Sequence, residues 1–446
     1  MNRNSLPPGP RGLPIVGSLF DYFRDMLGFL LRTARTYGDI AFFKLGSRKV
    51  YLLSHPDFIK DVLVTNHMKF HKSRALERSK IVLGEGLLTS EGETHLRERR
   101  IIQPVFHHRR IKAYADVMTD FASRIGENWE NGDVVDIHRE MMRLTLAIVA
   151  RTLFGAEIRS GADDIGKSLT TLVNQFPRML FPLSEYLDKI PLPSTRRFFN
   201  ALETLDNTVY QLIDLRRKSR VHGDDLLSML LSAQDEEGGD GLTDLQVRDE
   251  VMTLFLAGQE STANSLVWAW YLISQHPHVE EKLHDELDSV LGQRLPEVDD
   301  LKKLVFTRMV FSESLRLYPP AWTVVRRAIE DYQVDGYVVP SGADIYMSQY
   351  VVHHDPRFFP DPFTFDPERW NHDQASSLPQ FAYFPFGGGP RLCIGESFAW
   401  MEGIMLIAAI ASKWKMHLVP GQNIVPKPLI TIRPKSGMKM IMEKRS

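Results

Sequence analysis

Hydrophobic residues recur every three to four positions over most of the chain, which is the pattern of amphipathic α-helices. The clearest segments with this spacing are 56–66, 94–103, 110–131, 137–153 and 204–219. The longest predicted helix begins at Thr243 and ends near Gln275, just before His276-Pro277. Strand-like patterns are few and short, and they cover 40–45, 50–53, 337–339 and 438–442. The pattern therefore predicts a fold that is mainly α with a small β portion.

The apolar N-terminal stretch 13–31 is interrupted by Asp21, Arg24 and Asp25. We interpret it as an amphipathic helix preceded by a turn and not as a membrane span, so we expect no transmembrane anchor in this chain. Residues 235–241 are acidic and rich in glycine, which predicts a surface loop. Neither an internal repeat nor a linker between autonomous domains is visible, and we expect a single domain over residues 1–446.

The composition is that of a globular protein, with 43% hydrophobic and 25% charged residues. Lys and Arg together number 54 and Asp and Glu together 56, so the formal net charge is −2. A balance of this kind gives no overall attraction to nucleic acid or to an anionic membrane. We expect no nucleic-acid partner.

The chain has one cysteine, Cys393, which excludes an intrachain disulfide and any zinc or iron–sulfur site that needs two or more thiolates. This cysteine usage suits a reducing compartment, and we expect a soluble, cytoplasmic protein unless an N-terminal anchor has been removed. Cys393 follows three glycines and a proline (387–390), which favour a tight loop, and it precedes a predicted helix over 396–414. A thiol at a helix N-terminus is biased toward the thiolate. The alternatives are a buried, unreactive cysteine and a phosphate-binding loop, although the chain has no G-x-x-x-x-G-K-[ST] motif.

The residues around this cysteine fit the pattern Phe-x-x-Gly-x-Arg-x-Cys-x-Gly, at Phe386, Gly389, Arg391, Cys393 and Gly395. The segment resembles the haem-thiolate loop of the cytochrome P-450 monooxygenases, and the resemblance extends from Pro7 to about Met442. It implies the P-450 fold, with a haem b buried between the long central helix and the cysteine-loop helix. It also implies that Cys393 is the metal ligand, and that Phe386, Arg391 and Gly395 help to bind the cofactor.

Two further motifs resemble the structural core of this family. Glu313 and Arg316 match its Glu-x-x-Arg, and residues i and i+3 of a helix share a face on which their charges can pair. Pro367-Glu368-Arg369-Trp370 resembles its Pro-Glu-Arg-aromatic segment. The resemblance implies that Glu313, Arg316 and Arg369 form a buried charge cluster that braces the cysteine loop. The end of the first motif's helix, Tyr318-Pro319-Pro320, is typical of the eukaryotic-type branch.

The middle of the longest predicted helix reads Ala257-Gly258-Gln259-Glu260-Ser261-Thr262. A glycine beside a carboxylate and two hydroxyls favours a bend, which could simply be tolerated on an exposed face. The segment resembles the family's Ala/Gly-Gly-x-Asp/Glu-Thr-Thr, which implies that Glu260 is the proton-relaying acid. Serine replaces the usual threonine at 261 and lacks the methyl group that restricts the rotamer, so Thr262 could partly substitute.

The resemblance implies that donors to the carboxylates of the cofactor lie in two places. His95 and Arg99, one helical turn apart in 92–100, fall where the family has propionate partners. Arg326, five residues before Asp331, matches the family's propionate arginine better than Arg327 does. Together with Arg391, these guanidinium groups suit two carboxylates.

The reaction that the resemblance implies is insertion of one atom of O2 into an organic substrate, with electrons from an external donor because no reductase is fused to the chain. We expect an acidic ferredoxin, or a flavodoxin or flavin reductase, to bind a monomeric enzyme. The expected docking cluster is basic and comprises Arg97, Arg100, Arg109, Arg110 and Lys112. A solvated charged face is the alternative interpretation of these residues.

The substrate is expected to be hydrophobic, because the positions that line the family's pocket are apolar here. These positions are Leu87, Leu88, Leu254, Phe255, Ala257, Ala321, Trp322, Val324 and Ile430. A fatty acid, a terpenoid and a steroid fit equally well. Two other functions stay open: a haem-thiolate enzyme that uses peroxide or rearranges an oxygenated lipid, which the Glu260–Ser261 pair disfavours, and a haem-based sensor.

Overall fold

A computed structural model describes residues 6–156, 162–180, 188, 190–219, 225–233 and 242–445. Within these residues the chain forms two compact units. The first contains Met1–Glu77 and Ser312–Cys393, and the second contains Arg78–Phe311 and Ile394–Ser446. Two helices, α4 (Arg74–Arg78) and α15 (Val305–Leu317), begin in one unit and end in the other.

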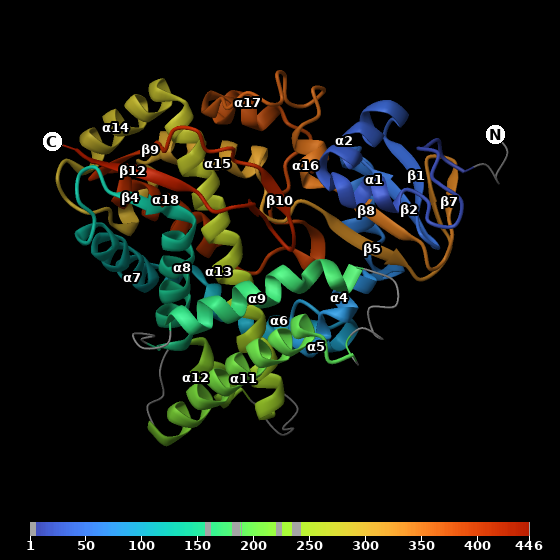
Figure 1. Ribbon diagram of the computed structural model, residues 1–446, viewed down its shortest axis with the longest axis horizontal. Coiled ribbons are helices and arrows are strands. Elements are labelled where there is room, and N and C mark those ends of the chain that lie inside the picture. Colours follow the sequence, from blue (N-terminus) through green and yellow to red (C-terminus); the bar gives the residue numbers. More distant parts are fainter. Residues whose placement is uncertain are drawn as a thin grey trace. The chain divides into compact units, whose positions relative to one another are not determined.

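The first unit is built on a five-stranded sheet (Figure 1). Its strand order is β1 (Ile40–Leu45), β2 (Arg48–Leu53), β8 (Asp344–Met347), β5 (Val324–Ala328) and β3 (Phe70–Lys72). β1 and β2 are antiparallel, and Gly46 in their two-residue turn has the positive φ (63°) that such a turn favours. β2 and β8 are parallel, and β6 (Tyr332–Val334) and β7 (Tyr337–Val339) form a separate hairpin. The other segments are α1 (Leu19–Arg24), α2 (Met26–Tyr37), α3 (Pro56–Lys60), η1 (Asp61–Thr65), η2 (His67–Lys69), α16 (Gln349–His353), η5 (Pro367–Trp370), α17 (His372–Ser377) and η6 (Gly389–Arg391).

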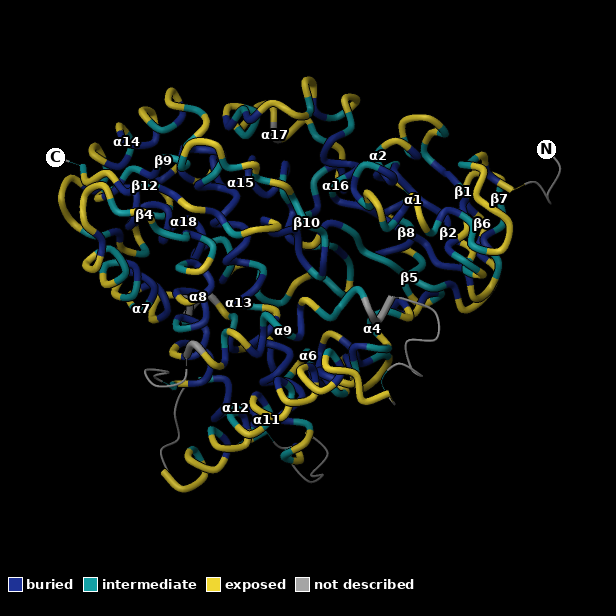
Figure 2. The backbone as a smooth tube through the Cα atoms, viewed as in Figure 1, coloured by how far each residue is buried: buried dark blue, intermediate teal, exposed yellow. Residues whose placement is uncertain are grey.

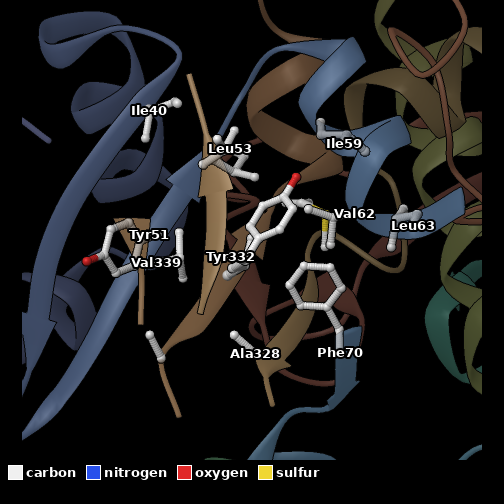
Figure 3. Close-up of a cluster of buried hydrophobic side chains, with 14 of the residues drawn as sticks. Ile40, Tyr51, Leu53, Ile59, Val62, Leu63, Phe70, Ala328, Tyr332 and Val339 are labelled. Atoms are coloured by element: carbon white, nitrogen blue, oxygen red, sulfur yellow. The ribbon is translucent and has the colours of Figure 1, made fainter. Parts of the chain in front are cut away.

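A hydrophobic core packs between this sheet and the α3–η1 segment (Figure 3). Tyr51 and Leu53 extend from β2, while Ile59 and Leu63 face them from α3 and η1. The ring of Tyr332 lies edge-on to Phe70, with 5.0 Å between the ring centroids. Apolar burial of this kind is the main source of stability in a folded unit, and here it also fixes the position of η1.

The second unit is mainly helical and is centred on α13 (Asp244–Gln275), which packs most extensively against α8 (Ile137–Phe154). α18 (Glu396–Ala411) packs against both α13 and α7 (His108–Glu127). Exposed residues are frequent on α7, α11 (Pro193–Ser219) and α14 (Pro277–Leu291), whereas α8 and α13 are mostly buried (Figure 2). The remaining helical segments are α5 (Lys80–Leu83), α6 (Gly92–Ile102), η3 (Gln103–Phe106), α9 (Ala162–Leu180), α12 (Leu226–Ser232) and η4 (Val298–Lys302).

Two small sheets complete this unit. β4 (Val134–Asp136), β12 (Lys439–Lys444) and β9 (Trp414–Leu418) form an antiparallel sheet in that order. β10 (Pro426–Pro428) pairs with β11 (Ile432–Pro434), next to α13. Trp268 of α13 is fully buried and donates its indole N–H to the Ile432 carbonyl at 3.0 Å, which ties the long helix to β11.

The predicted mainly α fold with a small β portion is confirmed, and α13 is continuous from Asp244. Thr243 caps it in a reciprocal capping box with Gln246. Within the stretch 13–31, the predicted turn followed by helical structure is confirmed, but the helix is not continuous. α1 and α2 are separated at Asp25, whose carboxylate accepts the Gly28 N–H at 3.0 Å and begins a new helix. The loop predicted over 235–241 lies outside the described residues. In the part of the chain that is described, no helix is long and apolar enough to cross a membrane.

Candidate functional site

The cysteine loop has a backbone that is fixed by its own hydrogen bonds. The Gly387 N–H donates to the Phe384 carbonyl (2.9 Å), and the Cys393 N–H donates to the Phe386 carbonyl (3.0 Å). Gly389 has a φ of +68°, and a Cβ there would lie 2.0 Å from the Leu63 carbonyl oxygen of η1. Glycine is therefore required at 389 for both conformation and space. At the end of this loop, Cys393 is exposed, three residues before the first residue of α18.

A buried ion cluster lies in the same unit as this loop. Arg316 forms a bidentate pair with Glu313, with Nη2–Oε1 and Nε–Oε2 distances of 2.7 and 2.8 Å, and both side chains are fully buried. The Arg369 Nε lies 3.4 Å from Glu313 Oε1, and the Trp370 indole donates to Glu313 Oε2 at 2.9 Å. The predicted cluster of Glu313, Arg316 and Arg369 is confirmed, with Trp370 as a further member.

In the second unit, the middle of α13 has one open face between two buried stretches. Ala257 is exposed, and Gly258 and Ser261 are half-buried, whereas the residues on either side of this segment are buried. Positions i, i+1 and i+4 share a face, so two small residues and one hydroxyl border the open space. The Ser261 hydroxyl donates to the Ala257 carbonyl at 2.6 Å, and the helix is unbroken there. Ser261 is thus the hydroxyl of the open face.

Glu260 occupies a different environment from Ser261, although the two are adjacent in sequence. Its side chain is buried, and its Oε1 accepts from Thr431 Oγ1 (2.9 Å) and Asn264 Nδ2 (3.1 Å). Oε2 has no hydrogen-bond partner among the described residues. Burial raises the pKa of Glu260, and the positive charge of Arg433 acts in the opposite direction. The carboxyl therefore holds a proton more readily than an exposed glutamate does.

Thr262 lies away from the open face, buried beside Glu402 of α18. The Glu402 carboxyl is fully buried, and neither of its oxygens has a hydrogen-bond partner among the described residues. Burial raises the pKa of Glu402 to about 8. Its neutral form therefore predominates at neutral pH, and Thr262 is its polar neighbour.

The predicted carboxylate-binding residues lie in both units. In α6, His95 is buried and Arg99 is half-buried, one turn apart on the same face. In β5, Arg326 is half-buried, whereas Arg327 is paired with Glu77, the Nη1–Oε2 distance being 3.0 Å. Neighbouring strand residues point to opposite faces, so the ion pair of Arg327 leaves Arg326 on the other face. Arg391 in η6, Phe386 and Gly395 are half-buried.

Several residues of these networks were not predicted. Thr431, Asn264 and Arg433 surround Glu260, but Thr431 and Arg433 are about 170 positions away in sequence, and no local pattern indicates the contact. Glu402 could have been found from the sequence, because it is the one acidic residue within the apolar run 401–411. A carboxylate in such a run is typical of a buried titratable group.

The donor set fits a haem. The Cys393 thiol would suit the role of iron ligand, and the half-buried arginines would suit carboxylates. In the second unit, the open face of α13 offers small side chains and a hydroxyl. Thiolate ligation by Cys393 is also favoured by its position before the N-terminus of α18.

Comparison with known proteins gives results that agree with this chemistry. The family model described as cytochrome P450 matches residues 7–441. Cyclooctatin synthase of Streptomyces melanosporofaciens is 39% identical over 99% of this chain and 96% of its own length. Cyclooctat-9-en-7-ol 5-monooxygenase of the same organism is 38% identical (95% and 94%), and pentalenene oxygenase of Streptomyces avermitilis is 33% identical (95% and 94%). A solved structure, retinoic acid bound cyanobacterial CYP120A1, has a TM-score of 0.87 and 27% identity, covering 99% of both chains.

Proposed function

The chain belongs to the cytochrome P450 family, and from this we propose that Cys393 is the thiolate ligand of a haem b iron in an enzyme that oxidises a cyclic terpenoid. The observation that carries the proposal is the exposed Cys393 sulfur at the end of a loop whose backbone is fixed by the Cys393–Phe386 hydrogen bond. The side chains proposed to hold the two haem carboxylates are the buried His95 and the half-buried Arg99, Arg326 and Arg391.

The protein is a monooxygenase: an oxidoreductase that places one oxygen atom of O2 in a hydrophobic substrate and takes electrons from a separate electron-transfer partner. A haem held by a thiolate supplies the activation of O2, because the thiolate donates electron density that favours O–O cleavage. The protein's own residues position the substrate, deliver protons and exclude water.

Proton delivery is proposed to depend on Ser261 and Glu260 in separate roles. The Ser261 hydroxyl borders the open face and can donate there instead of to the Ala257 carbonyl. Glu260 is buried behind it with a raised pKa, and its unpartnered Oε2 can pass a proton to an ordered water. Thr262, which faces Glu402, is proposed to act on the structure of this segment more than on the proton itself.

The substrate class is proposed from the names of the relatives and the character of the pocket positions. Pentalenene and cyclooctat-9-en-7-ol, as named, are an alkene and an unsaturated alcohol, neither of which carries a carboxylate. In the second unit Leu87, Leu254 and Phe255 are apolar and buried, and they provide no charged group to bind an acid. Among the three classes that fit the sequence, a terpenoid is therefore favoured over a fatty acid.

The electron donor is proposed to be an acidic ferredoxin, or a flavodoxin or flavin reductase, which binds a monomeric enzyme at the basic cluster. Arg100 and Lys112 are exposed, and Arg97 and Arg110 are half-buried, whereas the side chain of Arg109 lies outside the described residues. An acidic partner is favoured because complementary charges accelerate association.

Turnover assays test this function. Cyclic terpenoids, fatty acids and steroids are first screened for the change in the haem absorption spectrum that substrate binding causes. Each binder is then incubated either with NAD(P)H, ferredoxin and ferredoxin reductase or with hydrogen peroxide alone. We expect a terpenoid to gain one oxygen atom only in the first mixture. Equal turnover with peroxide alone would show a peroxygenase, and binding confined to fatty acids would contradict the substrate class.

A further inference from the structure

His353, the last residue of α16, connects the buried ion cluster to the cysteine loop. It is fully buried, and its backbone carbonyl accepts the Arg316 Nη1–H at 2.7 Å. On its other side, the His353 Nε2 accepts the backbone N–H of Phe384 at 3.0 Å. One residue thus contacts the Glu313–Arg316 pair through its main chain and the start of the loop through its ring.

The ring can accept this hydrogen bond only while it is neutral, because imidazolium has no free lone pair. Burial is the main cause that lowers the pKa of His353 well below its usual value, and the charges of His354 and Arg316 add to it. A neutral ring with a bare Nε2 carries its proton on Nδ1. His353 is therefore an acceptor near neutral pH.

Phe384 is the first fixed point of the cysteine loop. It is buried, so its N–H needs a partner, and its carbonyl accepts the Gly387 N–H at 2.9 Å. The Phe386 carbonyl then accepts the Cys393 N–H at 3.0 Å. Hydrogen bonds thus run from Arg316 through His353 and Phe384 to Gly387, and the neighbouring residue Phe386 makes the hydrogen bond to Cys393.

A second contact on the same residue supports this connection. The ring of Tyr383 lies against that of His353, with 5.1 Å between centroids, and against that of Trp370 at 4.3 Å. The Tyr383 hydroxyl donates to the Ser312 carbonyl at 3.1 Å. Tyr383 and Phe384 therefore both contact His353, and Tyr383 also contacts Trp370 of the ion cluster and Ser312 beside it.

We propose that His353 is a positioning residue for the cysteine ligand: its ring transmits the fixed geometry of the ion cluster to Phe384, and so keeps Cys393 oriented toward the haem iron. The inference rests on the proposed haem-thiolate function. It assigns this role to a histidine outside the motif residues. The ion cluster does not perform that role alone, because none of the described contacts of Arg316 and Glu313 reaches the cysteine loop: they end on 353, 359, 362, 364, 366, 369 and 370.

Two substitutions with side chains of similar length distinguish the effect of the hydrogen bond from the effect of packing. In His353→Gln the side-chain carbonyl is as many bonds from Cα as Nε2 and can accept from Phe384, whereas His353→Met fills similar space and is a poor acceptor. His354 is the matched control, because it is also buried but its Nδ1 contacts the Tyr350 carbonyl at 2.7 Å and its ring packs against Phe363 at 4.8 Å.

The measurement is hydrogen–deuterium exchange of the peptide spanning 384–393 in the holoenzyme. We expect His353→Met to accelerate exchange there roughly fivefold, because this is the effect of losing about one hydrogen bond. The exchange rates of His353→Gln and His354→Met should stay close to that of the wild type. The red-shifted ferrous–CO band should convert to a less shifted band faster in His353→Met alone. Equal exchange in His353→Met and His354→Met would overturn the proposal.

A second measurement on the unsubstituted protein covers the case in which His353→Met does not fold. Nitrogen NMR of 15N-histidine-labelled enzyme should show His353 as the Nδ1–H tautomer with a hydrogen-bonded Nε2. An Nε2–H tautomer would overturn the proposal. If the wild-type enzyme lacks the red-shifted band, the haem-thiolate function fails, whereas the exchange and tautomer results still report on the bracing of the loop.

Discussion

At the scale of single residues, the open face of α13 assigns different tasks to neighbouring side chains. Ser261 borders that face, Glu260 is buried against Thr431 and Asn264, and Thr262 is buried beside Glu402. Consecutive helical residues point about 100° apart, so the three polar groups face different surroundings.

Ser261→Ala should uncouple oxidation of the electron donor from oxidation of the substrate. Without the hydroxyl a proton must come from unpositioned water, and we expect the amount of product per NAD(P)H to fall about tenfold while more peroxide is released. Ser261→Thr restores the hydroxyl and should keep most of the coupling. Thr262→Val serves as the control, because it removes a hydroxyl from the buried side. Wild-type coupling in Ser261→Ala would show that Ser261 does not deliver the proton.

Gly389→Ala should destabilise the cysteine loop more than Gly387→Ala does. Both glycines have positive φ values, 68° and 75°, so an alanine at either position carries a strain of about 1–2 kcal/mol. Only at 389 would the new Cβ meet a backbone atom, the Leu63 carbonyl oxygen, while nothing lies within 4 Å of a Cβ at 387. Haem content and the midpoint of urea unfolding measure the difference. Equal losses in the two variants would mean that the contact with η1 does not matter.

At the scale of elements, α13 and α18 pack together with a carboxyl group in their apolar contact. Glu402 has a pKa of about 8 in the folded protein, against 4.5 for an unperturbed glutamate. Between these two values the folded state retains a proton that the unfolded state has lost. The free energy of unfolding therefore falls as the pH rises through this window, and Glu402 has no further effect above its folded pKa.

Glu402→Gln should remove that part of the pH dependence. The amide is neutral at every pH, so the difference in stability between variant and wild type should grow in the variant's favour from pH 5 to 8, by up to about 4 kcal/mol. Urea unfolding at a series of pH values measures it. Glu250, whose pKa is raised to about 9 mainly by burial, contributes in the same direction in both proteins and cancels in the comparison. Parallel pH curves would contradict the raised pKa of Glu402.

Helices and loops could be predicted from the sequence where neighbouring residues determine where they begin and end. They could not be predicted where contacts with distant residues determine this. The start of α13 follows from the Thr243 cap, and the cysteine loop follows from its glycines. The predicted helix over 396–414 is too long, since α18 ends at Ala411 and Trp414 begins β9. Trp414 is buried in a strand just as it would be in a helix, and hydrophobic spacing does not separate the two over so few residues. Likewise, the predicted start of a helix at 204 is wrong, because Pro193 is tolerated in the first turn of α11.

Across the whole molecule, positive and negative charges nearly cancel, so an electrostatic attraction to a partner must come from a local cluster of like charges. The net charge is −2, so long-range attraction of an acidic partner depends on where the cations gather. The basic cluster could be identified from the sequence, whereas only the structure shows that Arg100 and Lys112 are exposed.

Charge reversal in the basic cluster should slow reduction by an acidic ferredoxin. We expect the Arg100→Glu, Arg110→Glu, Lys112→Glu variant to be reduced at least about tenfold more slowly at low ionic strength, and to lose most of the salt dependence. Stopped-flow reduction of the haem measures both effects. Arg32→Glu, which changes an exposed cation of the first unit, is the control. Unchanged rates and salt dependence in the triple variant would place the partner elsewhere.

The ferrous–CO absorption spectrum reports whether Cys393, the one cysteine of the chain, is the thiolate ligand of a haem iron. The folded, haem-loaded protein should show a strongly red-shifted Soret band. Cys393→Ala should lose that band and the monooxygenase activity, and Cys393→Ser should alter the band even where haem is retained. A folded, haem-loaded wild-type protein without the red-shifted band, or a Cys393→Ala variant that keeps it, would show that Cys393 is not the iron ligand.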